Sequence, residues 1–213
     1  MKSTIRFIWL VMLTLVAAVP AALATTTWYV NGVSGSNSHN CTSPITACKT
    51  IKHAISLASS GDTIMVAAAI YAENLTISIS LKVIGSGAAT TIVDGGGVNT
   101  VVTISSATAH VTISKLTIRN GSSVSGGGIY NSGTVTLNLS AVIGNVAHHW
   151  GGGMWNGGTL TINNSTISRN SATVICTTQT VCVTNGGGIF NSAGTLAINQ
   201  QHHQREYRLC QLF

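Results

Sequence analysis

Residues 151–163 read Gly-Gly-Gly-Met-Trp-Asn-Gly-Gly-Thr-Leu-Thr-Ile-Asn, and the same order of residue types occurs three times in the second half of the chain. Each copy starts with a glycine triplet, at Gly126, Gly151 and Gly186. An apolar residue, an aromatic residue and an asparagine follow each triplet, and a segment of alternating apolar residues comes after the next glycine. The aromatic residues and asparagines at these positions are Tyr130, Trp155, Phe190, Asn131, Asn156 and Asn191.

The copies recur at a regular interval. The number of residues from the first triplet to the second equals the spacing within a second series of asparagines, Asn120, Asn145 and Asn170. A fixed period of about 25 residues is typical of solenoids. Because apolar residues alternate in short runs that Gly and Asn interrupt, each repeat is predicted to be a coil of short strands rather than a pair of helices. Equivalent strands of successive coils then pair in parallel about 4.8 Å apart, which predicts an all-β, single-stranded parallel β-helix.

Stacked coils bring equivalent side chains together. We expect the asparagines of both series to form side-chain amide ladders, and Tyr130, Trp155 and Phe190 to form a stacked column. We interpret the column as packing, the alternative being a platform for a sugar ring. All of these residues are therefore assigned structural roles.

Weaker copies of the repeat precede the glycine triplets. Short apolar strands separated by turns begin at Leu75, so the β-helix repeats are assigned to 75–199. Before them, apolar residues of 48–59 fall on one helical face. A solenoid needs a cap over its first coil. We expect this helix to provide it, within an N-terminal cap that spans 25–74.

Four segments of the cap resemble those of a known family. They read Trp28-Tyr29-Val30-Asn31, Cys48-Lys49-Thr50-Ile51, Gly61-Asp62-Thr63-Ile64 and Tyr71-Ala72-Glu73-Asn74. These segments look like the N-terminal cap of pectin-lyase-like right-handed parallel β-helix proteins. The glycine-triplet repeats resemble those of secreted bacterial β-helix proteins and, more loosely, those of polymorphic outer-membrane proteins. The resemblance covers about 28–199 and implies a right-handed parallel β-helix.

The first 24 residues are typical of a signal peptide. Lys2 and Arg6 accompany an apolar run from Phe7 to Val19, and a small-residue cleavage site ends at Ala24. The run is shorter than the roughly 20 residues of a membrane span. We therefore expect cleavage, export to the cell surface or the extracellular space, and no membrane span in the mature chain. The alternative is an uncleaved N-terminal anchor.

The composition argues against a nucleic-acid partner. Charged residues make up only 7% of the chain, and the formal net charge is +6. The basic residues are scattered along the chain, so no basic stripe forms.

Four of the five cysteines form two close pairs, Cys41 with Cys48 and Cys176 with Cys182. In an oxidising compartment each pair is predicted to close its loop as a disulfide. The alternative, a metal site, would want tighter spacing and nearby His or carboxylate ligands, which we assign to neither pair. Cys210 is left over.

The superfamily that the chain resembles includes pectate lyases, polygalacturonases and pectin methylesterases. Such chemistry needs carboxylates that are paired for hydrolysis or clustered around calcium. The mature chain has only Asp62, Glu73, Asp94 and Glu206. The first three are interpreted as turn or cap residues and Glu206 lies near the C-terminus, so we predict no catalytic residues and no cofactor.

Two further groups are tempting as sites. His148 and His149 could bind a metal, but we interpret them as a solvent-exposed turn in which Trp150 shields the coil below. Arg119 and Arg169 are placed at equivalent positions of two coils, on an exposed face that could meet anions.

The repeat breaks after Asn199. By analogy with 164–170, the next residues should read Asn-Ser-Thr-Ile-Ser-x-Asn, but they read Gln-Gln-His-His-Gln-Arg-Glu. A shift of one nucleotide in these codons restores the expected residue at every constrained position. We therefore hypothesise that 200–213 is an aberrant tail read out of frame. An open strand edge on the last coil would then favour self-association.

These inferences favour a secreted or cell-surface, non-catalytic β-helix that is structural or binds a polysaccharide or surface glycan. The alternative is a polysaccharide-active enzyme or a truncated fragment of one. A third possibility is the passenger of an outer-membrane autotransporter.

Overall fold

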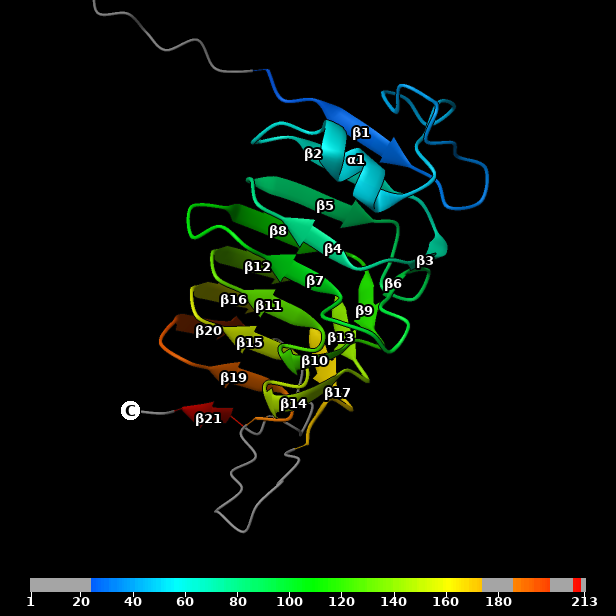
Figure 1. Ribbon diagram of the computed structural model, residues 1–213. Helices are drawn as coiled ribbons and strands as arrows, with labels where there is room; N and C mark the ends of the chain where they lie inside the picture. The colour runs from blue at the N-terminus through cyan, green and yellow to red at the C-terminus, as the bar shows by residue number, and fades with distance from the viewer. Residues whose placement is uncertain (1–23, 174–185, 200–208, 212–213) are drawn as a thin grey trace, which may run out of the picture.

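The computed structural model describes residues 24–173 and 186–199, and the backbone of 209–211. The chain winds into stacked coils whose equivalent strands lie side by side (Figure 1). All strand pairs that the described residues form within the four sheets are parallel. The predicted parallel β-helix is confirmed.

The largest sheet, sheet A, has seven strands, and sheet B has five. The strands of sheet A are β1 (Thr27–Val30), β2 (Thr63–Val66), β5 (Leu81–Gly85), β8 (His110–Ser114), β12 (Thr134–Asn138), β16 (Thr159–Asn163) and β20 (Thr195–Asn199). Those of sheet B are β3 (Ala69–Ala72), β6 (Thr91–Asp94), β9 (Thr117–Arg119), β13 (Ala141–Ile143) and β17 (Thr166–Ser168).

Sheets C and D complete the wall of the solenoid. The strands of sheet C are β4 (Leu75–Ile77), β7 (Val102–Ile104), β11 (Ile129–Asn131), β15 (Met154–Asn156), β19 (Ile189–Asn191) and β21 (Leu209–Gln211). The three strands of sheet D are β10 (Ser122–Ser125), β14 (Val146–Trp150) and β18 (Ser171–Ala172). A complete coil therefore passes through the sheets in the order A, B, D, C.

Alternation along each strand separates the core from the surface. In sheet A, Val135 and Leu160 pair with each other and are fully buried, while the intervening Thr136 and Thr161 are partly exposed. Successive side chains of a strand point to opposite faces. The Val, Leu and Ile residues therefore fill the inside of the solenoid, and Thr residues line its outside.

Steric constraints explain why the residues of each triplet are glycines. Gly151 has a φ of 63°, a left-handed conformation that glycine adopts without strain. A Cβ atom on Gly151 would also collide with the carbonyl oxygen of Met154, and one on Gly152 with the backbone of Ser171. The triplet therefore marks the corner between sheets D and C, where neighbouring backbones come too close for a side chain.

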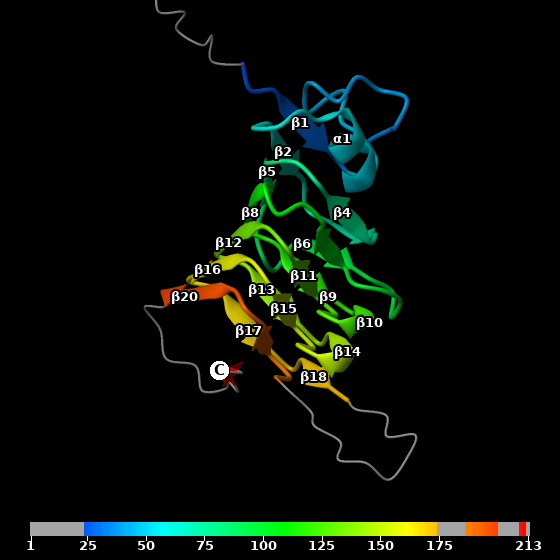
Figure 2. The same cartoon turned by 60° about the vertical axis from the view of Figure 1, so that its left-hand side comes forward.

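The predicted helix is present but shorter than expected. α1 spans Ile51–Leu57 instead of 48–59, with Thr50 as its N-cap. Cys48 cannot join it, because its backbone pairs with β1. The helix buries Ile51 and Ala54 and lies over the first coil, where it closes the N-terminal end of the core (Figure 2).

Two successive coils, from β8 to β12 and from β12 to β16, differ in length by one residue. His110 pairs with Thr134, and Thr134 pairs with Thr159. The second coil therefore contains one residue more than the first. The extra residue is absorbed in β14, whose pairing with β10 shifts register between Ser123 and Ser125. This shift is a β-bulge, which accommodates one extra residue without disturbing the strands on either side.

Some expectations concern residues outside the described part of the chain. They are the signal peptide, the loop that carries Cys176 and Cys182, and the tail apart from the backbone of β21. Within the described ranges, no helix has the length and apolar character needed to cross a membrane.

Candidate functional site

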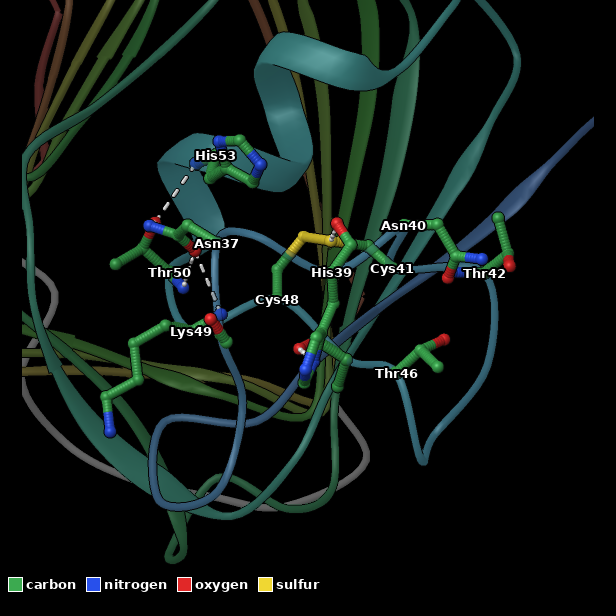
Figure 3. The surroundings of a disulfide bond; sticks show 12 residues. Asn37, His39, Asn40, Cys41, Thr42, Thr46, Cys48, Lys49, Thr50 and His53 are labelled. Carbon is green, nitrogen blue, oxygen red and sulfur yellow. Dashed lines mark hydrogen bonds between the residues drawn. A yellow bond between two sulfur atoms is a disulfide. The ribbon is translucent and has the colours of Figure 1, made fainter.

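The predicted disulfide between Cys41 and Cys48 is confirmed. The two Cα atoms lie 5.0 Å apart, and both side chains are fully buried. The loop that the bond closes lies beside the start of α1 (Figure 3). The other predicted pair, Cys176 and Cys182, lies outside the described residues.

A histidine that we did not associate with this pair lies next to it. One ring nitrogen of His53 and the Sγ atoms of Cys41 and Cys48 all lie within 4.8 Å of one another. Within the described ranges this is the one place where three His, Cys, Asp or Glu side chains gather closely enough to hold a metal ion. The sequence carried a weak signal, because His53 is in the first turn of a helix that starts soon after Cys48.

Asp62 is a buried structural carboxylate. It accepts hydrogen bonds from the backbone N–H of Thr26 at 2.7 Å and of Ser59 at 2.8 Å, and from the indole Nε1 of Trp28 at 2.8 Å. Burial alone would raise the pKa of Asp62, but these three donors outweigh it, and the pKa is lowered from its ordinary value. Asp62 thus ties the segment after α1 to the first strand.

Glu73 caps the helix. Its two carboxylate oxygens accept from the backbone N–H groups of Ile51 at 2.9 Å and Lys52 at 2.8 Å. These are amides of the first helical turn, which have no partner within the helix, and a carboxylate stabilises that end. The side chain joins the start of the helix to the segment between β3 and β4.

Asp94 forms an ion pair on the surface. Its carboxylate accepts from Arg119 Nε at 2.8 Å, from Asn120 Nδ2 at 2.9 Å and from the backbone N–H of Gly96 at 3.0 Å. Burial acts to raise the pKa of Asp94, but the hydrogen bonds from Gly96 and Arg119 outweigh it, and the pKa is lowered. All three carboxylates of the described residues therefore have structural partners, at three separate places.

Two asparagine ladders run through the inside of the wall. Asn131 donates to Asn156 at 2.7 Å, and Asn156 donates to Asn191 at 2.6 Å. In the second series, Asn145 donates to Asn170 at 3.0 Å. These side chains also bond to backbone groups of neighbouring strands and turns, so the ladders hold successive coils together.

The prediction that Asn120 belongs to the second ladder was wrong by one residue. Gly121 occupies the equivalent place and donates its N–H to Asn145 Oδ1. Asn120 instead has a φ of 54° and bonds to Asp94. The coil that starts here has one residue fewer than the coil that follows it. A prediction from a constant period therefore assigned Asn120 to the wrong position.

For the same reason, Arg119 and Arg169 do not lie at equivalent positions of two coils. Arg119 pairs with Ile143, which pairs with Ser168, so Arg169 is not its equivalent. With Arg119 engaged by Asp94, the two do not form the matched cationic face that we predicted.

The aromatic column is present in part. Tyr130 and Trp155 stack with ring centroids 4.3 Å apart and an interplanar angle of 10°. Phe190 pairs with Trp155 through its backbone, but its ring packs on Trp150, with centroids 5.9 Å apart. Since Tyr130 and Trp155 cover each other's faces, the column fits the packing role.

His148 and His149 lie in strand β14, not in the exposed turn that we predicted. His149 is exposed, and the buried Nδ1 of His148 has no hydrogen-bond partner among the described residues. No third ligand of the described ranges joins them in a metal-binding group.

The outer face of sheet A carries three rows of side chains, which we call the outer rows. They run along the solenoid axis and follow the strand register. The first row has His110, Thr134, Thr159 and Thr195; the second has Thr27, Thr63, Lys82, Thr112, Thr136, Thr161 and Ala197; the third has Tyr29, Met65, Ile84, Ser114, Asn138, Asn163 and Asn199. Within these rows Lys82 is the one Lys or Arg side chain, and no carboxylate is present.

A third asparagine ladder, which we did not predict, belongs to these rows. Asn163 donates to Asn138 Oδ1 at 2.7 Å, and Asn199 donates to Asn163 Oδ1 at 2.9 Å. The ladder uses one N–H of each donor, while an amide has two N–H donors and two acceptor lone pairs. Asn163 therefore keeps both a donor and an acceptor for other groups. An asparagine at the end of each alternating strand was the signal in the sequence.

The third row ends in a hollow at the N-terminal cap. This hollow of about 200 Å³ is lined by Tyr29 and Met65 of the row, by Pro44 and Ala47 of the disulfide-closed loop, and by polar Ser86 and Asn31. Its volume is smaller than the range of about 300–1,000 Å³ that is typical of small-ligand pockets. The face therefore combines rows rich in Thr and Asn toward the C-terminal coils with a small hollow at the N-terminal end.

Comparison with known proteins supports the fold. No family model matches the sequence, and no curated protein matches it. Among solved structures, pectin methylesterase PemA from Erwinia chrysanthemi is similar with a TM-score of 0.54 and 17% identity, over 82% of this chain and 54% of that one. A mutant pectin methylesterase in complex with a hexasaccharide has a TM-score of 0.47 and 15% identity, over 84% of this chain and 68% of the other.

At this identity the likeness to PemA concerns the fold, and the chain spans about half the length of PemA. It agrees with the parallel sheets described above. The chain therefore has a right-handed parallel β-helix fold, like that of PemA.

Proposed function

We propose that the protein is an exported, non-catalytic β-helix that binds an uncharged polysaccharide along the outer rows of sheet A. The observation that carries this proposal is the outer ladder of Asn138, Asn163 and Asn199, which is hydrogen-bonded yet keeps unused donors and acceptors on the surface.

The contrast between the ladders supports binding at this face. The Nδ2 group of Asn131 donates to Asn156 and to the carbonyl of Thr159, and its Oδ1 accepts from the N–H of Gly133. Those bonds serve only the fold. Asn163 has no comparable bonds to backbone among the described residues, so its remaining capacity is directed to the surface.

The chemistry of the face favours a polyol. Sugar hydroxyls both donate and accept, as do the Thr hydroxyls and Asn amides of the outer rows. Because Lys82 is the one Lys or Arg and no carboxylate is present in the rows, the face has little electrostatic preference for an acidic polymer. Rows with a repeat of about 4.8 Å favour an extended chain parallel to the solenoid axis.

The engagement of the acidic residues supports a non-catalytic role. Glycoside hydrolysis needs two carboxylates that flank one bond, whereas Asp62, Glu73 and Asp94 each hold structural bonds at different places. The confirmed disulfide and the signal-like segment 1–24 support export.

The test is binding of the chain from Thr25 onward to insoluble and soluble polysaccharides, both uncharged (glucans, xylan, mannan) and acidic (polygalacturonate). Calcium is included and omitted, and products are analysed for chain cleavage and ester release. The double variant Thr161→Ala/Asn163→Ala should weaken binding about tenfold or more. The matched control Thr103→Ala alters a partly exposed threonine of sheet C and should leave binding unchanged.

Retention on an uncharged polysaccharide that only the sheet-A variant weakens is the expected result. Substrate turnover would overturn the non-catalytic role. Binding to none of the polymers, or equal loss in the two variants, would overturn the assignment of the face.

A further inference from the structure

We propose that Cys41, Cys48 and His53 form a zinc site when the disulfide is reduced, so that a thiophilic metal ion and the S–S bond are alternative closures of the same loop. The inference is independent of polysaccharide binding. It starts from the one group of potential ligands within the described ranges, whose three donor atoms lie within 4.8 Å of one another.

The donor set suits zinc. Thiolate sulfur and imidazole nitrogen bind Zn²⁺ at about 2.3 Å and about 2.0 Å, which places ligands of one tetrahedral ion roughly 3.5–4 Å apart. Opening of the S–S bond lets the two sulfur atoms separate toward that spacing. The imidazole of His53 approaches from the helix above them, as Figure 3 shows.

Both cysteine backbones are positioned without the disulfide. The N–H of Cys48 donates to Tyr29 O at 2.8 Å, and Asn31 N–H donates to Cys48 O at 2.8 Å. The carbonyl of Cys41 accepts from Tyr29 N–H, also at 2.8 Å. These bonds attach both cysteines to β1, so the reduced chain keeps the two thiols close together.

His53 is positioned by a separate set of contacts. Its backbone N–H donates to Thr50 Oγ1 at 3.2 Å. Asn37 holds Thr50 in place. Its Nδ2 donates to Thr50 Oγ1 at 3.0 Å, and its Oδ1 accepts from the N–H groups of Lys49 and Thr50. The first turn of α1, and with it the histidine, therefore holds its place beside the thiols (Figure 3).

Burial favours a neutral metal complex. Cys41 and Cys48 are fully buried, and an isolated charge is costly in such surroundings. Two thiolates and one Zn²⁺ have no net charge, and the neutral imidazole adds none. The partly exposed His53 leaves an open side from which a water molecule can supply a fourth ligand.

The chemistry balances with a dithiol reductant. The reductant gives two electrons and two protons to the Cys41–Cys48 bond and becomes a cyclic disulfide, while the two cysteines become thiols. Zn²⁺ then displaces both thiol protons and forms two Zn–S bonds and one Zn–N bond. Zinc itself is neither oxidised nor reduced.

The test uses a chain in which Cys176, Cys182 and Cys210 are changed to Ser, so that only the Cys41–Cys48 pair remains. The protein is reduced with dithiothreitol, desalted without oxygen and titrated with Co²⁺ as the spectroscopic probe. We expect one Co²⁺ per chain, with a thiolate-to-cobalt charge-transfer band that Zn²⁺ abolishes. The oxidised protein should give no band, and His53→Ala should weaken binding about tenfold or more.

His39→Ala is the matched control, because His39 lies in the same region but its Nδ1 is 3.2 Å from Ala47 O; it should bind Co²⁺ as strongly as its parent. Circular dichroism follows folding of the reduced chain. Absence of the band, an equal band in the oxidised protein, or His53→Ala binding at parental strength would each overturn the proposal. A reduced chain that unfolds and does not refold on addition of Zn²⁺ would overturn it as well.

Discussion

Asn163 donates a 2.7 Å hydrogen bond to Asn138 one coil away, on the solvent side of sheet A. The same bond length joins Asn131 to Asn156, but there both side chains are fully buried. Equal geometry thus occurs in two environments. An unmet hydrogen bond is costly only where water cannot replace the lost partner.

The two ladders should therefore differ in their contribution to stability. Asn156→Ala removes the amide that bonds Asn191 and Thr195, and it also removes one of the two acceptors of the Asn131 amide. We expect the free energy of unfolding to fall by about 3 kcal/mol, against less than about 1 kcal/mol for Asn163→Ala. Chemical denaturation of both variants measures the difference, and equal losses would contradict it.

Asp62 should make stability depend on acid. Its pKa is lower in the folded protein than its ordinary value of 3.8, so the unfolded chain binds the proton more readily. The stabilisation is complete above the unfolded value and is lost as the pH falls through the lower folded pKa. The stability gap between wild type and Asp62→Asn should shrink as the pH is lowered below about 4. Urea unfolding between about pH 6 and about pH 2 tests this, and a constant gap would refute it.

Gly151 and Gly144 should respond differently to a side chain. Both have positive φ, at 63° and 65°, but a Cβ on Gly144 would meet open space. Gly151→Ala adds a collision with Met154 O to the conformational strain, so we expect a loss of about 3 kcal/mol or more in the free energy of unfolding.

Gly144→Asn is the control for this comparison. Asn120 and Arg169 adopt positive φ at the equivalent place in the coils on either side, and asparagine tolerates this conformation. Its cost should be within about 1 kcal/mol. Thermal unfolding of the two variants side by side decides the point, and a smaller loss for Gly151→Ala than for Gly144→Asn would be inconsistent with the steric explanation.

Removal of the disulfide should destabilise the cap without unfolding the protein. For a loop as short as that between Cys41 and Cys48, which are 7 residues apart, the chain-entropy cost corresponds to about 2.5 kcal/mol. We expect the double variant Cys41→Ala/Cys48→Ala to lose about that much stability and to keep its strand content. Denaturation with far-ultraviolet circular dichroism measures both, and loss of the native spectrum would show that the bond is required for folding.

Much of the fold could be predicted because strand and turn signals are local. The period-two pattern of Val135 to Leu137 specifies a strand with one buried face, and the triplet at Gly151 specifies a corner that only glycine fits. The two inner ladders follow from the same repeat, apart from Asn120. That residue could not be placed correctly from a constant period, because nothing local shows that β14 contains a bulge.

The surroundings of the disulfide were harder to predict, for a different reason. Whether His53 reaches Cys48 depends on where α1 begins, and apolar periodicity defines helix ends poorly. The cysteine backbone pairs with β1 and delays the helix to Ile51. The outer ladder, in contrast, was visible in the sequence as Asn138, Asn163 and Asn199, but a surface asparagine is common enough to escape notice.

The bulge in β14 also bears on how such a chain can diversify. It lengthens the step between coils by one residue, yet the strands before and after it keep their register. The corner between Asn191 and Thr195 likewise holds one more residue than that between Asn156 and Thr159, and again the strands on both sides stay in step. Insertions and deletions at corners and bulges can therefore accumulate in descendants of this gene while the outer rows of sheet A keep the same residues facing outward, so that the surface and the loops around it can evolve independently.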